Sequence, residues 1–110
     1  IGADGIAALA SSPHLSKLEL FDASENSIGD DGAIAIASSE SMRNLVHLDL
    51  LKSGIGEAGA IALANATQMT KLRVLKLRYN AIGEAGAKAL ASAPHLPDSV
   101  RAQFADQDAF

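Results

Sequence analysis

The chain has 110 residues, of which 48% are hydrophobic and 20% are charged, which suits one domain with a buried core and excludes a disordered chain. Its net charge of −4 and its aromatic content of 4% argue against a nucleic-acid-binding surface. Because cysteine is absent, disulfides, thiolate catalysis and cysteine-ligated zinc are excluded.

Targeting signals are absent from the sequence. No apolar run is long enough to span a bilayer, so we expect no membrane partner. A basic segment followed by an apolar run, as in a secretion signal, is not found at the start. We therefore expect a cytoplasmic protein, and a secreted effector is the alternative.

A repeat of 27 residues organises the sequence. Similar nine-residue runs begin at Gly2, Gly29, Gly56 and Gly83, with no insertion between them. Within each period the hydrophobic spacing changes once, from the alternation typical of a strand to the i, i+3, i+4 spacing of a helix. In chain order, this predicts a helix near 3–11, a strand near 20–23, a helix near 30–40, a strand near 47–50, a helix near 57–67, a strand near 74–77 and a helix near 84–92.

Constant strand–helix spacing predicts parallel strands joined by right-handed crossovers. Neighbouring strands stack about 4.8 Å apart, whereas neighbouring helices require about 10 Å. The predicted fold is therefore an α/β right-handed curved solenoid, with parallel strands on the concave face and helices on the convex face. Leu75 and Leu77 are expected to face the core, and Met42 and Met69 are expected to fill it.

The columns of the repeat carry a family resemblance. The third repeat has Leu72, Leu75, Leu77, Asn80, Ile82, Gly83 and Gly86; the second has Leu45, Leu48, Leu50, Ser53, Ile55, Gly56 and Gly59; the first has Leu18, Phe21, Ala23, Asn26, Ile28, Gly29 and Gly32. Over about residues 1–96 this pattern closely resembles the leucine-rich repeat, in its ribonuclease-inhibitor-like class, which implies a horseshoe arc. The resemblance also implies that Asn26 and Asn80 bind backbone groups where the chain leaves each strand. Ser53 departs from the pattern, so we expect a weaker hydrogen-bond ladder in the middle repeat.

We expect a single leucine-rich-repeat domain over residues 1–110. It divides into a partial repeat (1–17), three repeats (18–44, 45–71 and 72–96) and a degenerate C-terminal cap (97–110). A short strand near 101–104 is one option for the cap, with Gln107 in the column of the asparagines. The two Pro-His-Leu motifs (13–15 and 94–96) and the run 100–104 are similar to bacterial repeat proteins of this class.

The start of the chain lies in the middle of a repeat. Since solenoids generally need terminal caps, we interpret the chain as the C-terminal part of a longer array. Ile1, Ile6 and Leu9 would then lack a covering repeat. We therefore expect fraying or self-association through the uncapped N-terminal end.

One glycine motif resembles a nucleotide-binding fingerprint. Gly54, Gly56 and Gly59 form a literal G-x-G-x-x-G between a predicted strand and a predicted helix. The first glycine is replaced in the sister repeats by Ser27 and Ala81, whereas the other two recur. We therefore favour a packing role, expect no cofactor, and predict that Gly54 tolerates replacement better than the other two.

Other motifs fail as metal or catalytic sites. The run from Asp22 begins like a calcium loop, but Ser27 and Ala33 stand where glycine and glutamate are required. His14 and His95 are predicted to lie in separate surface turns and cannot form a ligand set. His47, Asp49 and Ser53 have the side chains of a catalytic triad, but an open sheet offers no oxyanion hole. We expect no metal site and no catalysis.

The outward strand side chains are the candidate binding residues. Residues 1–55 carry three basic and eight acidic residues, and residues 56–110 carry six basic and five acidic ones. This polarity predicts a non-enzymatic protein-interaction module that docks a protein partner on its concave face, with Leu51 and Tyr79 as apolar contacts. An ordinary solvated surface, a structural spacer at the end of an array and a recognition arm of a larger enzyme or host-directed effector are the alternatives. The candidate partner-binding residues are Asp22, Glu25, His47, Asp49, Leu51, Lys76, Arg78 and Tyr79, with Arg101 as an optional extension.

Overall fold

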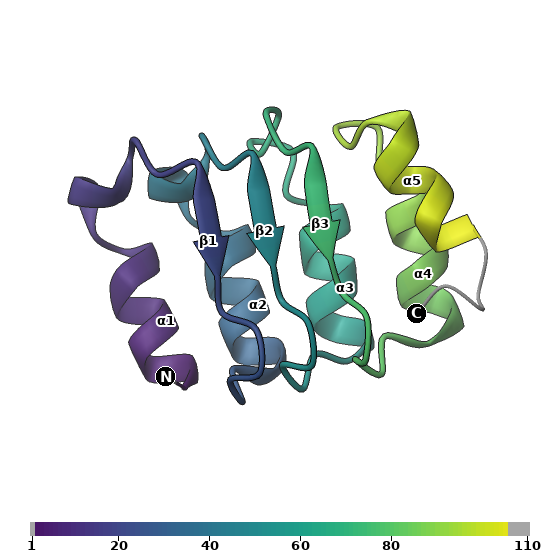
Figure 1. The fold of residues 1–110 in the computed structure, drawn as a ribbon, viewed down its shortest axis with the longest axis horizontal. Helices are drawn as coiled ribbons and strands as arrows, with labels where there is room; N and C mark the ends of the chain where they lie inside the picture. Colours follow the sequence, from purple (N-terminus) through teal and green to yellow (C-terminus); the bar gives the residue numbers. More distant parts are fainter. Residues whose placement is uncertain (1, 106–110) are drawn as a thin grey trace.

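Helices and strands alternate along residues 2–105, which are the residues that the computed structural model describes (Figure 1). Each repeat contributes one strand of three residues and one helix of eight or nine. In chain order the elements are α1 (Ala3–Ala10), the 3₁₀ helix η1 (Pro13–Leu15), β1 (Leu20–Asp22), α2 (Gly29–Ala37), the 3₁₀ helix η2 (Glu40–Met42), β2 (His47–Asp49), α3 (Glu57–Ala64), β3 (Val74–Lys76), α4 (Gly83–Ala91) and α5 (Asp98–Ala105).

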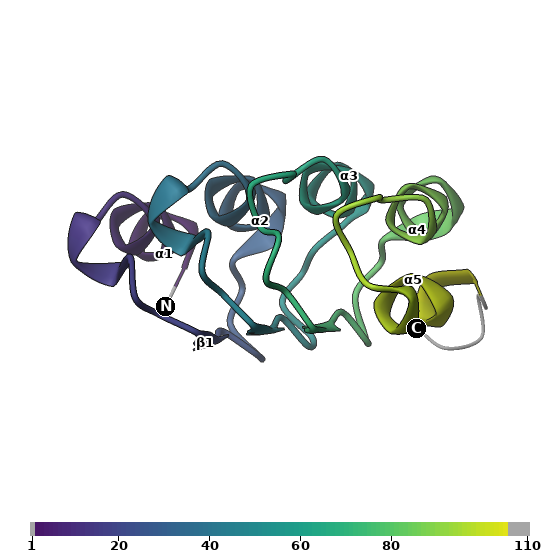
Figure 2. The same cartoon turned by 90° about the horizontal axis from the view of Figure 1, so that it is seen from above.

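The three strands form one parallel sheet in the order β1-β2-β3. Phe21, Leu48 and Leu75 are aligned across it, 27 residues apart, so the repeat sets the register. Figure 2 shows helices α1 to α4 in one layer and the strands in another. The chain therefore has an α/β repeat fold, and we call the side of the sheet that faces away from these helices the strand face.

The core lies between the two layers, as the hydrophobic columns predict. Leu75 and Leu77 are each 1% exposed, which confirms that they face inward. Met42 and Met69 belong to the same buried cluster, so their predicted role as core residues is also confirmed.

Two predicted helices end three residues early. Helix α2 ends at Ala37 and α3 ends at Ala64, because the residues that follow turn toward the preceding repeat. Ser39 is buried there, and its hydroxyl donates a hydrogen bond of 2.5 Å to the Ala10 carbonyl at the end of α1. A tertiary contact therefore overrides the helical propensity of these segments.

The predicted backbone bonds of Asn26 and Asn80 are present, and those of Asn80 also tie neighbouring repeats together. The Asn26 side-chain amide donates to the carbonyls of Ala23 (3.3 Å) and Ser24 (3.1 Å), where the chain leaves β1. The Asn80 side-chain amide donates to the carbonyls of Leu50 (2.7 Å) and Leu77 (3.1 Å), and its oxygen accepts from the backbone N–H groups of Ser53 (2.9 Å) and Ile55 (3.0 Å).

Ser53 keeps half of this arrangement. Its hydroxyl donates to the Ala23 carbonyl (3.0 Å), which is the counterpart of the Leu50 carbonyl one repeat earlier. A hydroxyl on one carbon is too short to replace the amide oxygen as an acceptor, and the N–H of Ile28 instead bonds the Asn26 carbonyl. The Ser53 hydroxyl therefore bridges the repeats through a donor bond, and the weaker ladder in this repeat stays a prediction.

A helix-capping contact between repeats was not anticipated. Asp30 belongs to the first turn of α2, where a carboxylate ordinarily interacts with the dipole of its own helix. Its Oδ1 instead accepts from the N–H groups of Gly56 (2.7 Å) and Gly59 (2.9 Å), at the start of α3. The carboxylate therefore caps the neighbouring helix.

The predicted tolerance order of the glycines is wrong for Gly56. Gly54 has φ +74°, a left-handed conformation that strains any other residue, whereas Gly56 has φ −109°. A Cβ on Gly56 would lie 3.3 Å from Asp30, so this position accepts a side chain more easily than Gly54. A Cβ on Gly59 would meet Ile55 at 2.8 Å and Ala33 at 3.0 Å, which confirms the packing role of that column.

The end of the described chain is a helix rather than the optional fourth strand near 101–104. Val100 and Phe104 are each 2% exposed, and their i, i+4 spacing suits one face of α5. Helix α5 lies beside the free edge of β3, where the Gln103 amide donates to the Leu75 carbonyl (2.7 Å). Arg101 pairs with Asp98 within α5, so it does not extend the strand row, and Gln107 lies outside the described residues.

The prediction that Ile6 and Leu9 lack cover at the N-terminal end of the array is also wrong in part. Ile6 is 0% exposed and belongs to the core cluster, since α2 packs beside α1. Leu9 is half-buried against the same cluster, and Ile1 lies outside the described residues.

Candidate functional site

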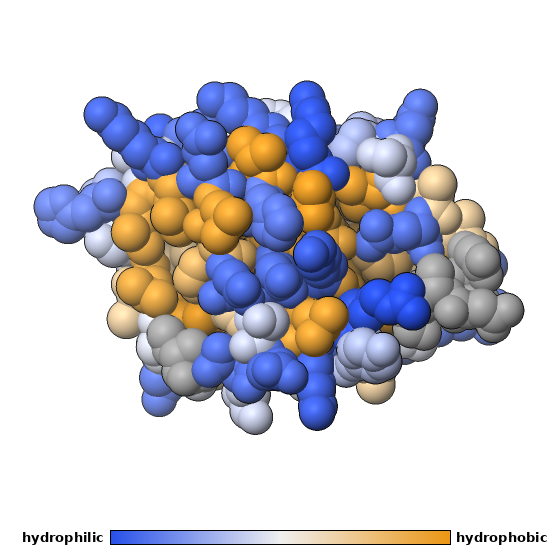
Figure 3. All heavy atoms as spheres, viewed as in Figure 1, coloured by the Kyte–Doolittle hydropathy of each residue, from blue (hydrophilic) through white to orange (hydrophobic). Residues whose placement is uncertain are grey.

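The strand face presents the predicted binding residues together. The register aligns Asp22, Asp49 and Lys76 across the three strands, so two acids and one base form a row on this face. Leu20 and Tyr79 are 57% and 70% exposed. Figure 3 shows hydrophobic and hydrophilic side chains interspersed over this face.

The two neighbouring aspartates are held by backbone hydrogen bonds. Asp22 Oδ1 accepts from the Ser24 N–H (2.8 Å), and Asp49 Oδ1 accepts from the Leu51 N–H (3.1 Å). Hydrogen bonds from the Ser24 side chain and backbone lower the pKa of Asp22, with smaller contributions from the charges of His47 and Lys76. Both carboxylates therefore close the turn after their strand, a role that their candidacy as binding residues did not include.

Three exposed residues beyond the strands have a left-handed backbone. Glu25, Lys52 and Tyr79 have φ values of 58°, 50° and 60°, in equivalent columns of the three repeats. None is glycine or asparagine, so the residue types alone do not signal this conformation. Because it recurs in every repeat, we assign it to the repeat's turn rather than to a particular site.

Two pockets adjoin on the strand face at Leu51. One has a volume of about 280 Å³ and is lined by Leu51, Lys76, Arg78 and Gln103. The other has a volume of about 310 Å³ and is lined by Glu25, Leu51, Lys52 and Tyr79. Gln103 was missed by sequence reasoning, because only the packing of α5 against β3 brings it to this face.

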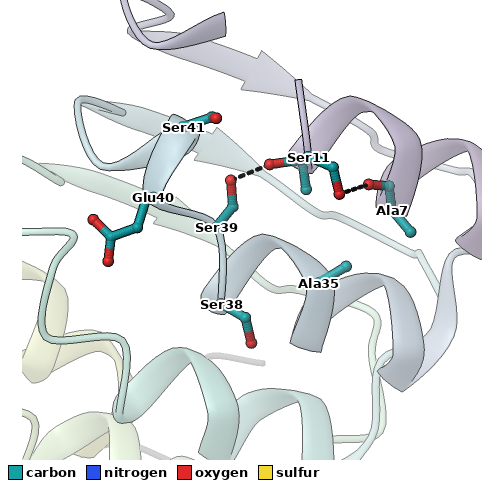
Figure 4. A pocket seen from close by; sticks show the side chains of 8 residues that line it. Ala7, Ser11, Ala35, Ser38, Ser39, Glu40 and Ser41 are labelled. Carbon is teal, nitrogen blue, oxygen red and sulfur yellow. Dashed lines mark hydrogen bonds between the residues drawn. The ribbon is translucent and has the colours of Figure 1, made fainter. Parts of the chain in front are cut away.

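A larger pocket lies away from this face, between the ends of α1 and α2, with a volume of about 410 Å³ (Figure 4). Its lining is mainly alanine and serine, with Glu40 as its one titratable side chain. The Ser11 hydroxyl donates to the Ala7 carbonyl (2.9 Å), and the Ser39 hydroxyl donates to the Ala10 carbonyl at the end of the same helix, α1. These hydroxyls satisfy helix-end carbonyls, so we assign the serines a structural role.

The residues that resembled a catalytic triad have other partners. Ser53 is 0% exposed, and its hydroxyl donates to the carbonyls of Ala23 and Leu51. Its oxygen is therefore not presented to a substrate. Within residues 2–105, no group of three or more histidine, cysteine, aspartate or glutamate side chains could hold a metal ion.

His95 is a half-buried titratable group outside the strand face, although it was predicted to lie in a surface turn. Its Nδ1 and Nε2 atoms are buried, and neither has a hydrogen-bond partner among the described residues. Burial lowers the pKa of His95 below 6.5, while the nearby Leu63 carbonyl acts less strongly in the opposite direction. His14, the equivalent residue 81 positions earlier, is exposed.

The lowered pKa of His95 predicts a loss of stability in acid. Between pH 6.5 and the lower folded-state pKa, the unfolded chain binds a proton that the folded chain does not, so the free energy of unfolding falls as the pH decreases. Above pH 6.5 the imidazole is neutral in both states and makes no such contribution. Urea unfolding at several pH values measures this decline.

The matched variants for this measurement are His95→Gln and His14→Gln. His95→Gln should flatten the decline of the free energy of unfolding below pH 6.5. His14→Gln makes the same replacement at an exposed residue and serves as the control. An unaltered profile in His95→Gln would count against the assignment.

Comparison with known proteins identifies the repeat. A leucine-rich repeat model matches residues 11–37, 41–64 and 68–91, which together make up well over half of the chain. The three matched segments end at Ala37, Ala64 and Ala91, the last residues of α2, α3 and α4. No curated protein is a significant match to the chain. In the part of the chain that the structure describes, no helix has the length and apolar character needed to cross a membrane. The chain belongs to the leucine-rich repeat family.

Proposed function

We propose that this chain is a non-enzymatic protein-interaction module that binds a protein partner through its strand face. Leucine-rich repeats are commonly protein–protein interaction modules. The observation that carries the proposal is the pair of adjoining pockets around Leu51, which are bordered by charges of both signs and by Tyr79. Exposed apolar and aromatic side chains beside arginine are residue types that interfaces favour.

The proposal includes the finer architecture. We infer that the strand face is the concave face of a right-handed curved solenoid of the ribonuclease-inhibitor-like class, because strands require less spacing than helices. A bacterial source, a cytoplasmic location and the division into repeats at 18–44, 45–71 and 72–96 belong to the same inference. The alternatives are a spacer or end cap of a longer array and a recognition arm of a larger enzyme or secreted effector.

The candidate residues have different proposed roles. Leu51 and Tyr79 supply apolar contact area near the centre of the surface. The acidic residues of the strand face, with His47 beside them, meet basic groups of the partner. Lys76 and Arg78 meet acidic groups of the partner. The acidic residues are Asp22, Glu25 and Asp49.

Tyr79→Ala is expected to weaken partner binding more than Lys52→Ala. Loss of an aromatic anchor often costs about 2 kcal/mol or more, which is roughly thirtyfold in affinity, whereas a rim charge mainly alters association rate and salt dependence. The pair is well matched, since both residues have left-handed backbones in equivalent columns. Titration calorimetry with a partner recovered by pull-down measures the two affinities.

The outcome that would overturn this assignment involves the helix layer. Lys88 is an exposed residue of α4, and α4 lies in the layer opposite the strand face. If Tyr79→Ala and Lys52→Ala both retain the partner while Lys88→Ala loses it, the partner binds the helices instead.

We further propose self-association at the N-terminal end. Among the described residues, β1 has a strand on one edge only, and Leu20 is exposed beside the other edge. A free strand edge presents unpaired backbone groups that another chain can bind. Light scattering over a concentration series tests this, and a monomer at every concentration would contradict it.

A further inference from the structure

We propose that the pocket between β3 and α5 binds a carboxylate side chain of an acidic peptide segment in the partner. The proposal rests on the strand face being the docking surface. It names the chemistry of one subsite, which is lined by Leu51, Lys76, Arg78 and Gln103.

Two cations lie at this pocket without a carboxylate partner. Lys76 and Arg78 are both exposed and two residues apart, so their side chains leave the chain on the same side of the sheet. In residues 2–105 the one ion pair within 4 Å is that of Arg101 with Asp98, so neither cation is paired in this way. The Arg78 guanidinium instead lies 6.0 Å from the centre of the Tyr79 ring. Two unpaired cations at one pocket favour an anionic ligand.

Gln103 adds a positioned neutral donor. One N–H of its amide bonds the Leu75 carbonyl (2.7 Å), and this bond holds the amide at the edge of the sheet. A side-chain amide carries two N–H groups, which leaves the second for an acceptor in the pocket. Leu51 supplies an apolar surface for the methylene groups of an incoming glutamate.

The pocket has room for one side chain of a docked peptide. Its volume is about 280 Å³, which lies near the small end of the range of roughly 300–1,000 Å³ found for ligand pockets, and it opens at the strand face.

The neighbouring acids favour a single negative charge. Asp49 is aligned with Lys76 in the sheet, and Asp22 lies one strand further away. These carboxylates offset part of the positive field, so they disfavour phosphate groups and polyanions more than one carboxylate. Asp22 and Lys76 are two strand spacings apart, about 10 Å. In an extended peptide, residues two positions apart lie about 7 Å from each other and point to the same side, and the long side chains of lysine and glutamate cover the remaining distance. The preferred segment therefore has a basic residue two positions from an acidic one.

A peptide titration tests the pocket without a natural partner. The probe is acetyl-Lys-Ala-Glu-amide, and the control peptide carries glutamine in place of glutamate. Nitrogen–proton correlation spectra of the 110-residue chain should shift at Leu51, Lys76, Arg78 and Gln103. We expect the glutamine peptide to bind about tenfold more weakly, because it lacks the charge-assisted bonds. Equal binding of the two peptides would overturn the proposal.

Matched variants locate the bound peptide. Arg78→Gln should weaken binding of the glutamate peptide about tenfold, whereas Arg73→Gln makes the same charge change at an exposed position outside the pocket and should have little effect. Gln103→Ala should weaken it less than Arg78→Gln. Equal effects of Arg78→Gln and Arg73→Gln would show a general charge effect and overturn the subsite.

Three further outcomes of these binding experiments separate the subsite from the docking surface and from a phosphate site. Inorganic phosphate that shifts the same four residues with higher affinity than the peptide would overturn the choice of a carboxylate. If the pocket binds the peptide but Tyr79→Ala and Lys52→Ala leave partner binding unchanged, the docking surface is wrong and the pocket stands. If the partner binds at Tyr79 but the peptide does not bind, the subsite alone is wrong.

Discussion

Leu77→Ala is expected to destabilise the folded chain by about 2–5 kcal/mol, as large-to-small changes in a closed core do. Leu77 is 1% exposed and lies just after β3, in the core cluster between the sheet and the helices. Removing its branched end leaves a cavity that the surrounding layers cannot close without moving. Urea unfolding followed by circular dichroism measures the loss of stability.

The control for this experiment is Val74→Ala. Val74 belongs to β3, three residues before Leu77, but it is 36% exposed on the strand face, so its truncation creates no cavity. We expect a change of less than about 1 kcal/mol. If both variants lose the same stability, Leu77 is not buried between the layers.

Asn80→Ala is the other change with a large expected effect. The alanine side chain would leave two backbone N–H groups, of Ser53 and Ile55, and the carbonyls of Leu50 and Leu77 without the amide that bonds them. An unsatisfied buried backbone group costs about 1–3 kcal/mol, and water can reach part of this half-buried site. We expect a total loss of about 3 kcal/mol, measured by urea unfolding.

Two comparisons make this result specific. Asn65→Ala replaces the same residue type at the exposed end of α3 and should change stability by less than about 0.5 kcal/mol. Ser53→Ala removes donor bonds alone and should cost less than Asn80→Ala. An Asn80→Ala variant as stable as Asn65→Ala would show that the bonds between repeats do not stabilise the fold.

The repeat made the secondary structure and core predictable. Leu48 and Leu75 belong to one column of the repeat, and Ile82 belongs to another. The spacing of such columns indicates which side chains face inward, because side chains alternate along a strand and return to the same side of a helix every 3.6 residues. Each column occurs in three repeats of the chain, so a single apolar residue at an exposed position did not change which columns were assigned to the core. The eight candidate binding residues lie on one sheet face or in the turns that border it, and their binding of a partner stays a prediction.

Predictions failed where the repeat ends or where one repeat touches another. The segment of Val100 and Phe104 has no sister copy, so its spacing alone had to decide between strand and helix, and burial on one helical face decided it. The contact of Asp30 with the N-terminus of α3 was not predicted, because a sequence pattern contains no information about which neighbouring N–H groups a carboxylate reaches.

The sequence by itself determined the period, the parallel order of strands, the inward columns and the polarity of the strand face, since each depends on spacing along the chain. Only the tertiary structure decided that Gly54 rather than Gly56 takes the left-handed conformation, and that Gln103 meets Lys76 and Arg78 at one pocket. A backbone angle follows from how a turn closes against its neighbours, and a pocket follows from how α5 packs on the edge of β3. Both depend on contacts between distant residues, which local periodicity does not specify.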